Sequence, residues 1–97
     1  MSEVVDNPAQ GRFEVTVDGH TGELTYRLRA KRLVLIHTEV PEELAGHGLA
    51  GELVKAAIAR AERDGLTVVP LCPYAREWFR KHPDAIANLD VDWTSSD

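Results

Sequence analysis

A strand–helix–strand pattern in the middle of the chain constrains the fold more than any other feature. Residues 33–39 begin with a continuous apolar run, Leu-Val-Leu-Ile, which is typical of a strand covered on both faces. Apolar residues then recur at helical spacing over residues 48–64, and Gly65 is a typical residue for ending such a helix. Residues 66–69 predict a second short strand, which Pro70 ends. If the two strands pair in parallel, the crossover through the helix is right-handed.

Shorter periodic stretches precede this unit, and a helix follows it. Apolar and polar residues alternate over residues 13–17 and 24–28, which predicts two strands of an antiparallel hairpin. Pro73 fits the first turn of a helix over residues 74–81, and residues 84–89 add one more turn. We therefore expect an α/β (α+β) fold, with an antiparallel β-meander, a right-handed β-α-β crossover and a short C-terminal helix.

The length and the composition of the ends predict one domain. A chain of 97 residues has room for a single core. Residues 1–10 are predicted to be a flexible lead-in, residues 11–90 the folded domain and residues 91–97 a polar tail.

Charge and cysteine content argue against several classes of function. The net charge of −5 disfavours general affinity for nucleic acid or for an anionic membrane surface. No apolar run approaches the roughly 20 residues needed to span a bilayer. The N-terminus lacks the pattern of a signal peptide, and the single cysteine cannot form an intramolecular disulfide. We therefore expect a cytoplasmic protein.

The turn Gly46-His47-Gly48 stands directly before the predicted helix. Residues 44–50 offer consecutive main-chain N–H groups at the positive end of a helix dipole, with little side-chain bulk, and such a segment can bind a pyrophosphate. An ordinary turn is the alternative interpretation. The Gly-Lys-Ser/Thr of a nucleotide-hydrolysing loop is missing, so phosphoryl transfer is rejected.

Three side chains near the carboxyl ends of the predicted strands are candidates for chemistry. Cys72 stands between a strand end and a helix start, where a thiolate is favoured, but it could equally be a small buried apolar residue. Tyr74 could donate a proton or simply pack with its aromatic neighbours. His37 could act as a base or make a structural hydrogen bond. None of the four histidines has a second ligand at metal-binding spacing, so we predict no metal site.

Several of these segments together resemble one known family. The sequence at residues 37–40, the Gly46-His47-Gly48 turn, Cys72-Pro73-Tyr74-Ala75, Trp78 and His82-Pro83 is similar to the small single-domain branch of the GNAT N-acetyltransferase superfamily. The resemblance covers about residues 11–90. It implies acetyl-CoA as co-substrate, held by backbone amides at its pyrophosphate and by strand backbone along its pantetheine.

The resemblance also implies roles for individual residues. Gly46 and Gly48 match the loop pattern of the superfamily, whereas Glu43 and Ala45 stand where positively charged or polar residues are common. Cys72 matches a cysteine that is a suggested catalyst in the small branch. The implied cofactor-binding residues are Thr38, Glu39, Val40, Leu44, Ala45, Gly46, His47, Gly48, Leu49, Ala50 and Cys72, and the implied catalytic residues are Cys72, Tyr74 and His37.

The favoured function is acetyl-CoA-dependent N-acetyl transfer to an unidentified amine. We expect the acceptor site to be open, because the chain has no room for the extra helices that shape this site in larger members of the superfamily. A non-catalytic module that binds CoA or an acyl-CoA is the first alternative. A thioester hydrolase that pairs Cys72 with a histidine is the second, and it needs an imidazole within hydrogen-bond reach of the sulfur.

Overall fold

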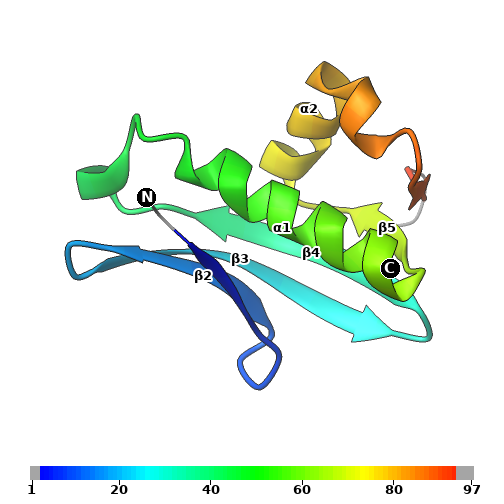
Figure 1. The fold of residues 1–97 in the computed structure, drawn as a ribbon, viewed down its shortest axis with the longest axis horizontal. Helices are drawn as coiled ribbons and strands as arrows, with labels where there is room; N and C mark the ends of the chain where they lie inside the picture. The colour runs from blue at the N-terminus through cyan, green and yellow to red at the C-terminus, as the bar shows by residue number, and fades with distance from the viewer. Residues whose placement is uncertain (1–2, 94–97) are drawn as a thin grey trace.

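The computed structural model describes residues 3–93, and both α-helices pack on the same face of a single six-stranded sheet (Figure 1). The strands lie side by side in chain order, from β1 at one edge to β6 at the other. The elements are β1 (Val4–Asn7), β2 (Arg12–Val17), β3 (His20–Arg29), β4 (Arg32–Glu39), the 3₁₀ turn η1 (Glu42–Leu44), α1 (Leu49–Asp64), β5 (Thr67–Pro70), α2 (Pro73–Lys81), the 3₁₀ turn η2 (Pro83–Ile86) and β6 (Asp90–Val91).

The pairing of the strands confirms the predicted fold class. Strands β1 to β4 pair antiparallel with one another, whereas β5 runs parallel to β4, with α1 as the crossover between them. The β3–β4 pairing shifts register between Thr25 and Tyr26, as at a β-bulge. Within the described residues, neither α-helix has both the length and the apolar character required to cross a membrane.

The core lies between the helices and the sheet. The apolar stripe of α1, which includes the fully buried Leu53 and Ala57, packs on Leu24 and Leu35 from the central strands. Helix α2 adds Phe79 to the same cluster. Burying one leucine side chain in such a layer is worth about 2 kcal/mol.

Strand β4 is longer than its partner β5, so part of its edge is unpaired. The two strands pair only from Arg32–Thr67 to Leu35–Pro70, while β4 continues along β3 to Glu39. Where β5 ends, the Cys72 main-chain N–H donates to the Leu35 carbonyl at 2.8 Å. No described strand covers the far edge of residues 36–39. We call this segment the unpaired β4 edge.

The two ends of the domain differ from the prediction. Residues 1–10 were expected to be flexible, but β1 lies within them and pairs with β2. The strand is held because Asp6 accepts hydrogen bonds from Tyr26 and Arg60, two residues that are remote in sequence. In the expected polar tail, Val91 belongs to β6, and Trp93 meets Phe79 edge-on with ring centroids 6.1 Å apart. Residues 1–2 and 94–97 lie outside the described part of the chain. Pro70 is the last residue of β5 rather than the residue after it.

Candidate functional site

The glycine turn between η1 and α1 depends on backbone conformations that favour glycine. Gly46 has a φ of 86° and Gly48, the N-cap of α1, a φ of 71°. A Cβ at either position would meet no atom within 4 Å. These glycines are therefore required by the left-handed backbone and not by lack of space.

The free N–H groups of the turn are fewer than the sequence predicts. The amides of Leu44 and Ala45 close η1 by donating to Pro41 and Glu42 at 2.9 and 3.0 Å, so these two are not available to an anion. From Gly46 to Gly48, no main-chain N–H has an acceptor within residues 3–93. The amides of residues 49–50 follow in the first turn of α1, where helices leave N–H groups without a partner. The available donors are thus those of residues 46–50.

An open hollow of about 260 Å³ lies against this turn. It extends from Val40, the residue that follows the unpaired β4 edge, to Tyr74 at the beginning of α2. Glu39, His47 and Thr38 do not line it. The lining residues are Val40, Leu44, Ala45, Gly46, Gly48, Leu49, Ala50 and Tyr74.

Among residues 3–93, no basic side chain lines the hollow. Glu43 stands where the resemblance implies a glutamine or an arginine. Its side chain is 61% exposed, and its carboxylate lies 4.0 Å from the His20 Nδ1. An anion in the hollow would therefore be held by main-chain N–H groups and by the N-terminal end of the α1 dipole, equivalent to about half a positive charge.

Cys72 is enclosed in the core at the N-cap of α2. Its side chain is 1% exposed, and its Sγ lies 3.1 Å from the Thr38 hydroxyl. Of the two interpretations of Cys72, this geometry agrees with the small buried residue, because Thr38 and the apolar layer around α2 cover the thiol. Thr38 was predicted only for its backbone, and its hydroxyl is the additional polar partner of the sulfur.

Tyr74 stands at the rim of the hollow, with 42% of its surface exposed. Partial burial and, to a smaller extent, the negative charge of a Cys72 thiolate raise the pKa of Tyr74 above that of a free phenol. The phenol therefore keeps its proton at neutral pH and is available as a donor.

His37 lies on the other face of the sheet from the Thr38 hydroxyl, because successive side chains of a strand alternate. Its side chain is 62% exposed, and its Nε2 is 3.9 Å from the Glu39 carboxylate. The structure thus brings Cys72, Thr38 and Tyr74 together and leaves His37 apart. Across residues 3–93, no three His, Cys, Asp or Glu side chains are grouped as metal ligands.

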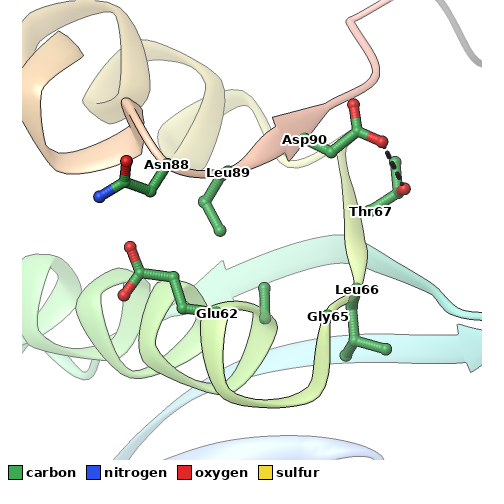
Figure 2. Close-up of a pocket in the computed structure, with 8 residues that line it drawn as sticks. Glu62, Gly65, Leu66, Thr67, Asn88, Leu89 and Asp90 are labelled. Atoms are coloured by element: carbon green, nitrogen blue, oxygen red, sulfur yellow. Dashed lines mark hydrogen bonds between the residues drawn. The ribbon is translucent and has the colours of Figure 1, made fainter.

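A second hollow, of about 200 Å³, lies at the opposite end of α1 (Figure 2). Glu62 and Asp90 line it, and Asp90 accepts a hydrogen bond from Thr67 at 2.9 Å. The C-terminal end of a helix and two carboxylates both repel an anion. A phosphate-bearing ligand is therefore expected at the glycine turn and not here.

Gly51 is a residue of this region that the sequence interpretation missed. It is buried inside α1, and a Cβ there would lie 3.2 Å from the Trp78 Nε1 and 3.7 Å from the Tyr74 hydroxyl. Glycine is unfavourable within a helix by about 1 kcal/mol relative to alanine. A glycine in the middle of a predicted amphipathic helix could therefore have indicated, from the sequence, that another element packs closely against α1 at this position.

Comparison with known proteins places the chain in a family. Residues 12–89 match the GCN5-related N-acetyl-transferases, and the chain belongs to that family. The resemblance read from the sequence is thereby confirmed.

Relatives and a solved structure agree with this. Protein NATD1 of Mus musculus is 34% identical over 83 residues, which cover 81% of this chain and 76% of that protein. Protein NATD1 of Gallus gallus is 36% identical over 75 residues, which cover 74% and 68%. The solution NMR structure of a GCN5-like protein from Staphylococcus aureus matches with a TM-score of 0.71 and 22% identity, over 97% of this chain and 91% of that one. That last likeness concerns the fold alone.

Proposed function

We propose that this chain is an N-acetyltransferase that transfers the acetyl group of acetyl-CoA to an amine. The observation that carries the proposal is the row of unpartnered amides at residues 46–50, which opens α1 beside the hollow. Membership of the family supports the reaction class, and the superfamily resemblance supplies acetyl-CoA as the donor.

The arrangement supports a path for the co-substrate. The amides of residues 46–50 would hold the pyrophosphate through hydrogen bonds and the helix dipole. Pantetheine, an extended chain with amide groups, would lie along Thr38, Glu39 and Val40, where the unpaired β4 edge offers free main-chain groups. This path leads from the glycine turn toward Cys72 and Thr38.

The proposed transfer is direct. The amine nitrogen attacks the thioester carbonyl carbon, a C–N bond forms, and the C–S bond breaks. Tyr74 donates its proton to the departing sulfur, and the amine gives up its own proton to water, because His37 lies on the other face of the sheet. The Tyr74 phenolate then regains a proton from water. A positioned proton donor typically contributes 10²- to 10⁴-fold to the rate.

Cys72 lies enclosed beneath the end of this path and is not the nucleophile in this proposal. A thiol enclosed in apolar surroundings is less reactive than one at an exposed, electropositive site. Its Sγ is hydrogen-bonded to a hydroxyl, and no imidazole contacts it in the described structure. For the same reason, the cysteine-dependent thioester hydrolase has no support from the geometry.

A non-catalytic coenzyme-binding module is the second candidate, and one observation favours it: in the described part of the chain, no basic side chain lines the hollow. Release of free CoA from acetyl-CoA separates the two candidates. Release that requires an added amine supports the transferase. Thermal stabilisation by CoA without any release supports the module.

The test of the anion site is Gly48→Ala, with Gly65→Ala as the matched control. Both glycines cap α1 in the left-handed conformation, at φ values of 71° and 66°, and both have open space around the missing Cβ. Each variant should lose about 1 kcal/mol of stability, the typical cost of alanine in this conformation. Only Gly48→Ala should also weaken CoA binding, by about tenfold in a calorimetric titration. Equal CoA affinity in the two variants would remove the turn from the site.

A further inference from the structure

We propose that the surface formed by Trp78 of α2 and by His82, the residue that follows the helix, binds the adenine base of the coenzyme. This surface is called the aromatic shelf below. The inference rests on the proposed function, since it assigns a place to the part of acetyl-CoA that lies beyond the pyrophosphate.

The shelf arises from the helical repeat. Trp78 lies in the last turns of α2 and His82 directly follows the helix, so their rings lie on the same side as Tyr74, which stands four residues before Trp78. The Trp78 and His82 rings are stacked, with centroids 3.9 Å apart and planes inclined by 16°. Together with Glu77 and Lys81, the three rings line a hollow of about 280 Å³. Flat rings beside an open hollow are suited to a planar, aromatic ligand.

The shelf is continuous with the anion site. Tyr74 lines both this hollow and the one at the glycine turn. Gly51, in the first turns of α1, lets Trp78 and Tyr74 approach that helix, because a Cβ there would lie 3.2 Å from Trp78. A nucleotide whose pyrophosphate is held at residues 46–50 therefore has the shelf as its neighbouring aromatic surface.

Polar groups at the shelf also suit an adenosine phosphate. The Nδ1 of His82 lies 2.8 Å from the Trp78 carbonyl, which can only accept, so Nδ1 carries the hydrogen of that bond. The other ring nitrogen, Nε2, has no partner among residues 3–93 and can bond to a base edge. Lys81 adds a positive charge beside the hollow, which can attract the 3′-phosphate of the coenzyme.

The test compares two ligands by calorimetric titration. CoA carries the adenine, whereas 4′-phosphopantetheine keeps the pantetheine and one phosphate but has no base. Stacking of a base on an aromatic side chain is worth about 1–3 kcal/mol, or roughly 5- to 150-fold in affinity. Trp78→Leu should therefore weaken CoA binding by about tenfold and leave the affinity for 4′-phosphopantetheine unchanged.

A spectroscopic measurement keeps the test valid if Trp78→Leu fails to fold. Trp93→Phe leaves Trp78 as the one tryptophan of the chain and keeps an aromatic ring against Phe79. Adenosine 3′,5′-bisphosphate should quench the fluorescence of this variant in a saturable way, and pantetheine should not.

The outcomes separate this inference from the proposed function. If CoA binds with the same affinity to wild type and to folded Trp78→Leu, or if the bisphosphate leaves the fluorescence unchanged while CoA binds, the shelf is not the adenine site and the proposed function stands. If neither CoA nor 4′-phosphopantetheine binds to the wild type, both proposals fail.

Discussion

Cys72 and Tyr74 stand two residues apart at the beginning of α2 but have different surroundings. The Cys72 thiol is enclosed and bonded to the Thr38 hydroxyl, whereas the Tyr74 phenol is partly exposed at the rim of the hollow. Their separation in sequence does not predict this difference, because it depends on which face of α2 meets the sheet. The proposed chemistry follows the exposed phenol.

This difference predicts unequal effects of substitution. Tyr74→Phe should lower kcat for acetyl transfer by about 10²-fold, since it removes the proton donor. Cys72→Ala should lower kcat less than about fivefold and should cost about 1 kcal/mol of stability through lost packing. Steady-state kinetics and urea unfolding measure the two quantities. A loss of all transfer in Cys72→Ala, with normal CoA affinity, would instead establish a covalent route through the thiol.

Tyr26 predicts a loss of stability at alkaline pH. Burial, followed by the hydrogen bond and the charge of Asp6, raises the pKa of Tyr26 above the value of about 10 of a free phenol. The folded state therefore holds this proton more tightly than the unfolded state does. The resulting stabilisation is complete below pH 10 and is lost as the pH rises through the folded pKa.

The corresponding variant is Tyr26→Phe. It should be about 1 kcal/mol less stable than wild type at pH 8, because the hydroxyl no longer bonds to Asp6, and its stability should fall less between pH 8 and pH 11. Urea unfolding at the two pH values gives both differences. Tyr74 also has a raised pKa, but its contribution is common to both proteins and cancels in the comparison. Parallel pH profiles would show that the Tyr26 proton is not linked to folding.

At the scale of elements, β1 is held by side chains as well as by its ladder with β2. The Asp6 carboxylate accepts from the Tyr26 hydroxyl at 2.5 Å and from Arg60 at 2.6 Å. Arg60 belongs to α1 and is 14% exposed, and it also bonds to Asp64 at 3.0 Å. This cluster therefore joins the edge strand, a central strand and the helix.

Removal of the carboxylate should detach β1. Asp6→Ala is expected to lower the free energy of unfolding by about 2 kcal/mol, because a partly buried guanidinium loses a charged partner. Glu52→Ala is the matched control, since its carboxylate pairs with Lys55 at 3.5 Å on an exposed face and should contribute less than about 0.5 kcal/mol. Chemical denaturation measures both. Similar losses in the two variants would mean that β1 is held by its ladder alone.

The elements that could be predicted from the sequence are those with a repeated pattern. The apolar spacing of α1 and the alternation in β2 specify their type and nearly their bounds, whereas β3 was predicted over residues 24–28 and begins earlier, at His20. Strands β1 and β6 have four and two residues, too few for a period to appear, and both are held by partners remote in sequence. Their existence depends on tertiary contacts that a local pattern cannot contain.

At the scale of the whole molecule, the position of the site could be predicted better than its details. Both the glycine turn and Cys72 follow the carboxyl ends of neighbouring strands, and the parallel pairing of β4 and β5 brings them to the same edge. The hydrogen bonds of η1 determine which amides of the turn remain free, and the shift in the β3–β4 register determines the face of the sheet that His37 occupies. Neither has a signature in the sequence.

The enclosure of the one thiol has a consequence for the chemistry of the chain outside catalysis. Oxidants and alkylating agents react with thiolates that they can reach, and the Cys72 sulfur is screened as long as α2 stays docked. Covalent dimers through this sulfur would therefore form from opened molecules and not from native ones. The same packing that withholds the sulfur from substrates protects the folded protein from redox damage.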